Sequence, residues 1–179
     1  DPKQQPHGGE SAAAAATAAA AAEKVGALVA PTIPVGIAQH HMAFSGTITL
    51  KPSTLVLMIK EWVMSLAHHG FERFFFVNGH GGNVATIGAA FSEIYGERSF
   101  AKDGDNHPAL RCRQLNWWES PAAKAIVKEL YGANEGMHAA CSEVAVTQYA
   151  FPEHIKKVEM DPPLGPKPSR FSDAQDFRR

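Results

Sequence analysis

Three features are scarce in this sequence, and each scarcity excludes a class of protein. Only two of the 179 residues are cysteines, which excludes a disulfide framework and fits a reducing compartment. The formal net charge is −1, so electrostatics give no reason to expect binding to nucleic acid or to an anionic membrane surface. No apolar run reaches the roughly 18 residues of a membrane span, and no secretory signal is visible. We therefore expect a cytoplasmic protein, or a protein of the plastid stroma if its source is a photosynthetic eukaryote.

The two ends of the chain differ from its middle. Residues 12–22 are alanines interrupted only by Thr17, and alanine has the highest helix propensity, so this run predicts a helix. Such a helix has almost no side chain to bury. Alternatively, the alanines stand for residues that were not identified, and residues 1–22 are then unreliable or incomplete. Residues 161–179 form a Pro-rich tail that we expect to be truncated.

Between these ends, short apolar runs alternate with amphipathic stretches. Short runs rich in apolar and β-branched residues predict strands, which we expect within residues 27–36, 47–50, 73–78 and 109–118. The run within residues 73–78 is continuously apolar, as is typical of a strand covered on both faces. Apolar residues at helical spacing predict helices, which we expect within residues 51–71, 83–97, 120–132 and 142–151. This alternation predicts an α/β protein with three α/β/α layers and a mostly parallel sheet, built as a single domain over residues 1–160. In such sheets, ligands bind beyond the carboxyl ends of the strands.

Three of the expected helices show faces or ends that can be assigned. The first should be capped by Ser53 or Thr54 and end at Gly70, and its apolar face should comprise Leu55, Ile59, Trp62, Val63 and Leu66. The second should bury Val84, Ile87, Ala90, Phe91 and Ile94. The third shows the usual pattern of N-cap, first-position proline and terminal glycine, supplied by Ser120, Pro121 and Gly132.

His80 is the most informative single residue. It lies in "FFFVNGHGGN", just after an expected strand and before a helix, so its side chain should reach the crevice at the sheet edge. The surrounding glycines remove bulk and free the backbone. Three interpretations remain open: a tight turn with Asn83 as helix cap, a phosphate site at the helix N-terminus, or a metal ligand.

Four other groups of residues are candidates for chemistry. His138 and Glu143 lie five residues apart at a loop-to-helix junction, where Ser142 can cap the helix and the helix dipole favours a carboxylate. His40 and His41 are adjacent, so they are expected to point in opposite directions, with one of them entering the site. The other two groups are the pair Trp117 and Trp118, which can form a pocket wall or pack in the core, and the pair His7 and Glu10, which can supply further metal ligands.

Three motifs together resemble one known family. "PVGIAQHHMAFSGTITL", "FVNGHGGN" and "HAACSEVAVT" occur in the order and spacing of the creatininase (creatinine amidohydrolase) family, over roughly residues 26–160. The "NWW" segment and the "FSDAQDFRR" tail are most like the branch of uncharacterised members found in cyanobacteria. The resemblance implies an α/β/α creatininase-like fold, a homo-oligomer that is commonly a hexamer, and a site for two divalent ions of Zn, Mn or Fe. It also implies hydrolysis of a C–N bond in a small, often cyclic, amide.

The resemblance also implies roles for individual residues. His80 matches a metal ligand, and His138 with Glu143 matches the motif that carries catalytic groups. His41 matches the histidine of a loop near the substrate, and Asn83, Trp117 and Trp118 are expected in the same pocket. His7 and Glu10 are the candidates for the N-terminal metal ligands, although Gln5 stands where the family carries a glutamate if His7 is its histidine.

Two further hypotheses follow from these observations. The first is a catalytically inactive creatininase-like subunit that has a structural or binding role in a larger assembly, because the N-terminal ligand motif is incomplete. The second is a flavodoxin-like binder of a nucleotide or phosphate at the "GHGGN" turn. A metal-dependent amidohydrolase predicts loss of activity on chelation, whereas a phosphate binder needs no metal.

Overall fold

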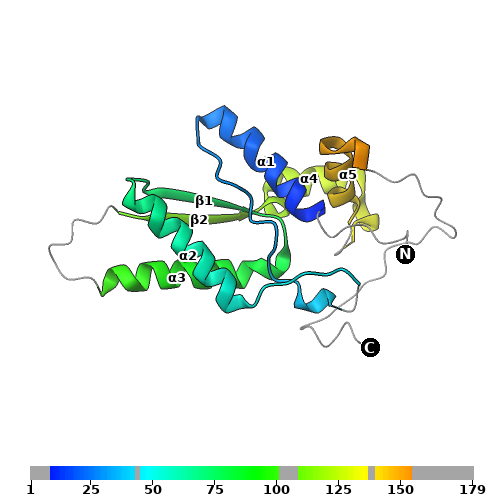
Figure 1. Ribbon diagram of the computed structural model, residues 1–179. Coiled ribbons are helices and arrows are strands. Elements are labelled where there is room, and N and C mark those ends of the chain that lie inside the picture. Colours follow the sequence, from blue (N-terminus) through cyan, green and yellow to red (C-terminus); the bar gives the residue numbers. More distant parts are fainter. Residues whose placement is uncertain (1–8, 43–44, 101–108, 137–139, 155–179) are drawn as a thin grey trace. The chain divides into compact units, whose positions relative to one another are not determined.

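The computed structural model describes residues 9–42, 45–100, 109–136 and 140–154, without the side chains of residues 9–13. Figure 1 labels the α-helices and strands of the chain. The chain divides into two compact units. One unit comprises Val35–Asn116, and the other combines Asp1–Pro34 with Trp117–Arg179. Among the described residues, no helix has both the length and the apolar character needed to cross a membrane.

The unit Val35–Asn116 contains a parallel pair of strands, β1 (Arg73–Asn78) and β2 (Arg111–Asn116). The register pairs Arg73 with Arg111 and continues to Asn78 opposite Asn116. Both strands therefore end at the same edge, and two asparagines lie side by side there. The strands at 73–78 and within 109–118 were both predicted, and their parallel pairing is confirmed.

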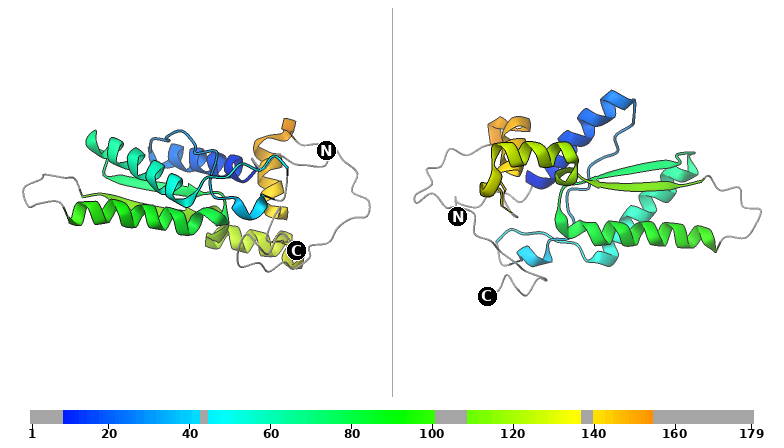
Figure 2. Two further views of the ribbon diagram at one scale, coloured as in Figure 1. Left: turned by 60° about the horizontal axis from the view of Figure 1, so that its bottom comes forward. Right: turned by 180° about the vertical axis from the view of Figure 1, so that it is seen from behind.

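Two helices complete this unit, α2 (Pro52–His68) and α3 (Val84–Ser99). They pack against each other, and Figure 2 shows β1 and β2 side by side with α3 running along them. The buried residues of α2 recur every four positions and are Leu55, Ile59, Val63 and Ala67. Those of α3 are Thr86, Ile87, Ala90 and Ile94, and Phe91 meets Phe76 of β1 with ring centroids 5.4 Å apart.

Most of the predicted core faces are confirmed, and the exceptions lie at the margins of each face. Trp62 is 37% exposed. It lies beside, and not within, the row of buried residues that recurs every four positions along α2. Val84, in the first turn of α3, is also 37% exposed. The predicted N-cap of α2, Ser53 or Thr54, was wrong: Lys51 occupies the N-cap position, and Pro52 begins the helix. A first-position proline suits a helix start because its missing N–H would have no partner there.

Two predicted strands are absent from the described part of the chain. Residues 27–36 have no strand structure, and Leu28 within them is 83% exposed. Pro31 and Pro34 in this segment remove backbone donors that a strand in the sheet interior would need. Residues 47–50 also form no strand, because their polar groups bond to the loop that begins at Gly36.

The other unit is helical in its described part. It contains α1 (Gly9–Val25), α4 (Pro121–Leu130) and α5 (Cys141–Ala150), and α1 packs against α5. The helix predicted from the alanine run is confirmed, and two of its alanines, Ala14 and Ala22, are buried. The predicted cap of α4 is confirmed as well, since Ser120 Oγ accepts a hydrogen bond from Ala123 N–H at 3.1 Å.

Candidate metal centre

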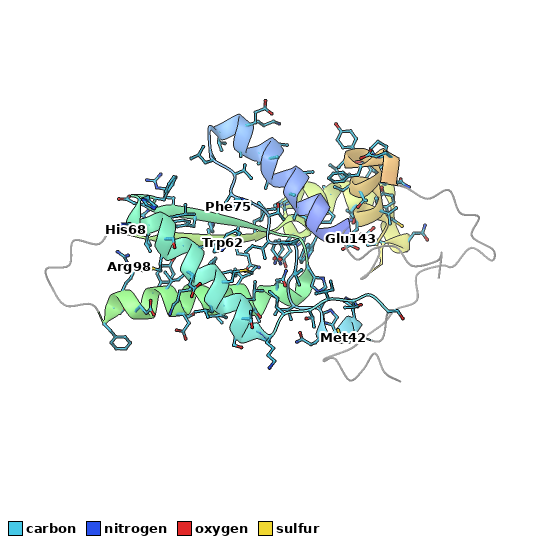
Figure 3. All side chains as sticks on the ribbon, in the orientation of Figure 1. Met42, Trp62, His68, Phe75, Arg98 and Glu143 are labelled. Carbon is cyan, nitrogen blue, oxygen red and sulfur yellow. The ribbon has the colours of Figure 1, made fainter. Side chains whose placement is uncertain are left out.

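Three histidines meet in the unit Val35–Asn116. His80 lies two residues after the end of β1, and His40 and His41 lie in the short 3-10 helix Gln39–His41. One ring nitrogen from each histidine can be chosen so that all three lie within 4.8 Å of one another. The rings of His40 and His80 are stacked with centroids 5.2 Å apart and an interplanar angle of 9°. Figure 3 labels Met42, the residue that follows the 3-10 helix Gln39–His41.

A network of side-chain amides holds the backbone of His80. Asn78 Oδ1 accepts a hydrogen bond from His80 N–H at 3.2 Å, and Asn78 Nδ2 donates to the His80 carbonyl at 2.8 Å. Asn78 Nδ2 also donates to Asn116 Oδ1 at 2.8 Å, across the ends of the two strands. Gln114 Nε2 donates to the same oxygen at 2.8 Å. Because Asn78 and Asn116 are 3% and 8% exposed, these bonds are shielded from water and orient His80 firmly.

Asn83 connects the two segments that carry the histidines. Its Oδ1 accepts a hydrogen bond from Ile37 N–H at 2.8 Å, and its Nδ2 donates to Asn78 Oδ1 at 3.2 Å. The interpretation in which Asn83 caps the following helix is confirmed for its position and not for its side-chain bonding. Asn83 does occupy the N-cap position of α3, but its side chain makes no cap bond. A Cβ at Gly36 would collide with this amide, so the close approach requires glycine there.

The loop that carries His40 and His41 is closed by two threonines. Thr49 Oγ1 accepts a hydrogen bond from Ala38 N–H at 2.8 Å. Thr47 Oγ1 donates to the His41 carbonyl at 2.9 Å. The first bond is made by the residue just before the 3-10 helix and the second by its last residue, so together they fix both ends of the helix. In this way residues 47–50, which were predicted to form a strand, position the histidine pair instead.

Because Gly82 has no side chain, it leaves room for the rings of His40 and His80. A Cβ at this position would lie 2.7 Å from His80 Nε2 and 2.9 Å from His40 Cε1. It would also lie 2.5 Å from the carbonyl oxygen of Ile37. All three distances are shorter than ordinary contacts, so any larger residue would displace the rings. Glycine at position 82 is therefore needed for the packing of the histidines.

The cluster fits a bound transition-metal ion. Three atoms with a mutual spacing of 4.8 Å or less share a central point that is about 2.8 Å or less from each of them. Zn–N bonds are about 2.0–2.1 Å long, so each ring needs to move by less than about 1 Å to bind Zn²⁺. Rotation about the side-chain torsions supplies movements of this size. We therefore regard His40, His41 and His80 as a candidate metal centre.

The structure corrects the prediction for the adjacent histidines. They were expected to point in opposite directions, and only His41 was assigned to the site. Instead their ring centroids are 4.0 Å apart, and both rings belong to the cluster. Opposite orientation applies to strands, in which side chains alternate, whereas this pair lies in a 3-10 turn, in which successive side chains diverge by about 120°. The sequence analysis missed His40 because it did not predict that residues 39–41 form a 3-10 turn.

Glu143, Trp117 and Trp118 belong to the other unit. Glu143, labelled in Figure 3, is half-buried in the first turn of α5, as predicted. Its Oε2 accepts a hydrogen bond from Ala140 N–H at 2.9 Å. Trp117 is 8% exposed and meets Trp118 edge to face, with ring centroids 6.2 Å apart. Among the described residues, no group accepts a hydrogen bond from Trp117 Nε1. The roles predicted for Glu143, Trp117 and Trp118 in the active site stay predictions.

The predicted cap of α5 was wrong. Ala140 occupies the N-cap position, and Ser142 lies inside the first turn. The hydroxyl of Ser142 donates to Glu135 Oε1 at 2.5 Å, and its N–H donates to Glu135 Oε2 at 3.2 Å. Because Ala140 has no side-chain acceptor, the carboxylates of Glu135 and Glu143 satisfy the first N–H groups.

Three predicted site residues lie wholly or partly outside the described residues. His7 and His138 fall in segments that the structure does not describe. Glu10 belongs to the first turn of α1, but its side chain is outside the described part. Their roles as metal ligands or catalytic groups therefore stay predictions.

The chain is similar to several known proteins. The model of the Creatininase family, described as creatinine amidohydrolase, matches residues 3–179. The mycofactocin precursor peptide peptidase of Mycobacterium ulcerans (strain Agy99) is 38% identical over 72 residues, which cover 40% of this chain and 28% of that protein. The creatinine amidohydrolase of Pseudomonas putida is 28% identical over 115 residues, which cover 62% of this chain and 43% of that protein. The aligned regions thus span less than half of each relative.

Solved structures show the same fold. A crystal structure of creatinine amidohydrolase (creatininase) has a TM-score of 0.66 at 23% identity and covers 91% of this chain and 66% of that chain. A structure described as "Creatininase Mn" has a TM-score of 0.64 at 22% identity and covers 91% of this chain and 67% of that chain. These similarities show that the predicted α/β fold is correct.

Proposed function

Because the chain belongs to the creatininase family, we propose that it is a metal-dependent hydrolase that cleaves a C–N bond of a small linear or cyclic amide. The observation that carries this proposal is the cluster of three histidines at the carboxyl end of β1. Ligands of parallel α/β sheets bind at this edge, and imidazole nitrogen is a common ligand of catalytic metals. A bound divalent ion would polarise the amide carbonyl and lower the pKa of a coordinated water.

The residues of the chain would supply binding, orientation and proton transfer. His80 would hold the metal, with its backbone fixed by Asn78. Glu143 would bind metal or carry a proton, and His138 would stabilise the developing negative charge or donate a proton to the leaving nitrogen. Trp117 and Trp118 would form an apolar wall of the substrate pocket. His7 and Glu10 would complete the ligands of a second ion, and the family resemblance adds a homo-oligomer to the proposal.

Activity under metal control tests this function. The purified chain is treated with a chelator, dialysed, and assayed on creatinine, other small cyclic amides, linear amides and short peptides, with and without added Zn²⁺ or Mn²⁺. We expect hydrolysis that disappears on chelation and returns with metal. Substitution His80→Ala should reduce the rate to background, whereas His68→Ala, at the exposed end of α2, should leave it unchanged. Activity that persists in the chelated protein would contradict the proposal.

An inactive relative is the second candidate, and Gln5 favours it. If His7 is the N-terminal histidine of the family motif, a neutral amide replaces the glutamate ligand, and an amide oxygen is a weaker ligand than a carboxylate. In that case the chain would bind metal and turn over none of the amides. Restored turnover after metal addition would exclude this candidate.

A further inference from the structure

We infer that the face of β1 and β2 opposite the one packed against α3 is a docking surface for an acidic protein segment that also carries apolar side chains. This basic face is formed by alternate residues of the two strands, which are Arg73, Phe75, Val77, Arg111, Arg113 and Leu115. It combines three guanidinium groups with exposed apolar side chains. The inference is independent of the proposed hydrolysis.

The strand register puts the members of the basic face on one side of the sheet. Side chains alternate along a strand, and the parallel register sets Arg73 beside Arg111 and Phe75 beside Arg113. Phe76, which points to the other side, meets an aromatic ring of α3. The basic face is therefore the side that α3 leaves open.

The three arginines of the basic face are exposed and close to one another. Neighbouring strands lie about 4.8 Å apart, and alternate residues of one strand about 7 Å apart, so the Cα atoms of Arg73, Arg111 and Arg113 lie within about 8 Å of one another. Within the described part of the chain, no carboxylate forms an ion pair with any of them. Like charges directly opposite each other in a sheet repel, so carboxylates from a partner would relieve this repulsion.

The same face carries apolar surface that a small anion would leave in water. The apolar run of β1 is typical of a strand covered on both faces, yet Phe75, labelled in Figure 3, is 59% exposed. Leu115, in register with Val77, is 37% exposed. A protein segment can cover the apolar side chains and the arginines together. Aromatic and arginine side chains dominate the energetics of protein interfaces, so the composition of the face favours a protein partner.

The charge of the basic face distinguishes between kinds of partner. A second copy of the chain that docked through the same face would bring arginines against arginines, which opposes self-association there. The net charge of the whole chain is −1, so long-range attraction to nucleic acid is absent. Carboxylates accept paired hydrogen bonds from guanidinium groups. The partner should therefore carry Asp or Glu beside apolar residues.

The arginines lie away from the histidine cluster. Arg73 begins β1, and His80 follows the other end of the strand. The strand spans six residues, so the Cα atoms of Arg73 and Asn78 are about 16 Å apart. Substitution of Arg73 should therefore leave amide hydrolysis unchanged, which separates a failure of this inference from a failure of the proposed function.

Binding of acidic polymers to the whole chain tests the inference. The probes are fluorescently labelled poly-glutamate, a random copolymer of glutamate and tyrosine, and a DNA duplex, each titrated with protein at low and at physiological salt. The variants are Arg73→Gln, Arg113→Gln and Phe75→Ser. The control is Lys51→Gln, which removes an exposed positive charge at the N-cap of α2. Thermal melting followed by circular dichroism shows that each variant is folded.

The expected result is tighter binding of the glutamate–tyrosine copolymer than of poly-glutamate, because only the copolymer can cover the apolar side chains. Arg73→Gln and Arg113→Gln should each weaken the binding of both polymers by about 2–5-fold, as is typical of exposed ion pairs. Added salt should weaken binding further. Phe75→Ser should remove the preference for the copolymer, and Lys51→Gln should bind like the unmodified chain.

The opposing results are defined for each part of the inference. Failure of both polymers to bind at low salt would overturn it, as would unchanged binding in both arginine variants. Tighter binding of the DNA duplex than of the copolymer, lost in Arg73→Gln, would assign the face to nucleic acid and overturn the protein partner. Equal affinity for the two polymers, unaffected by Phe75→Ser, would reduce the face to a site for anions and contradict the docking of a protein segment.

Discussion

Substitution Asn83→Ala should lower both the stability of the fold and the affinity of the metal centre. Asn83 joins Ile37 N–H to Asn78 Oδ1, so its amide links the start of the histidine loop to the end of β1. The side chain makes no bond to the N-terminal N–H groups of α3. The effect of the substitution is therefore the loss of this link and not the loss of a helix cap.

The magnitude follows from the two groups that lose their partner. Ile37 is 3% exposed, so its N–H would be left buried and unsatisfied, which costs about 1–3 kcal/mol. Asn78 Oδ1 keeps the bond from His80 N–H, so its loss should be smaller, about 0.5–1 kcal/mol. We expect a total of about 1.5–4 kcal/mol, a large fraction of the roughly 5–15 kcal/mol that stabilises a typical protein.

Urea denaturation, monitored by circular dichroism, measures the change in the free energy of unfolding. Asn134→Ala is the control. Asn134 is an exposed asparagine, and its substitution should change the free energy of unfolding by less than about 0.5 kcal/mol. Zn²⁺ affinity should fall by about 10–100-fold in Asn83→Ala, as expected for a residue that positions ligands. An Asn83→Ala protein with unchanged stability and unchanged Zn²⁺ affinity would refute the reasoning that Asn83 connects the two segments.

Three further predictions concern the core, a helix cap and a thiol. Ile59→Ala should lower the free energy of unfolding by about 2–5 kcal/mol, because Ile59 is 2% exposed, whereas Leu57→Ala, at a side chain 51% exposed, should cost much less in the same denaturation experiment. Ser120→Ala should cost about 1 kcal/mol by loss of the α4 cap, and Ser120→Thr should restore most of it; full stability in the alanine variant would contradict the role of the cap. Burial raises the pKa of the Cys112 thiol, although its hydrogen bond with Tyr95 opposes the shift. In a Cys141→Ser background, labelling of Cys112 should therefore keep accelerating above the pH at which an ordinary thiol is ionised, and this pH profile should return to the ordinary range in urea. Because the folded pKa is raised, the stability contributed by the neutral thiol is present below the ordinary thiol pKa and is lost as pH rises through the folded value.

The sequence by itself predicted the elements whose signals are local. Ser120 and Pro121 begin α4 as their residue types indicate, and Leu55, Ile59 and Val63 are buried because helical spacing puts them on one face. Residues 73–78 form a strand, as a short continuous apolar run next to a glycine indicates. The position of His80 at the end of this strand follows from the same local order, so the most important candidate ligand could be found without a structure.

Tertiary structure decided the features that depend on distant partners. Residues 27–36 and 47–50 have strand-like composition, but a strand forms only where another strand offers matching donors and acceptors, and in the described structure the second segment bonds to the loop beginning at Gly36 instead. Asn83 could be read as a helix cap from its neighbours, yet its partner Ile37 is 46 positions away. His40 joined the cluster for the same reason, since only the folded loop brings its ring beside that of His80. Local sequence specifies what each residue can do, and the contacts made across the fold select which of these possibilities is realised.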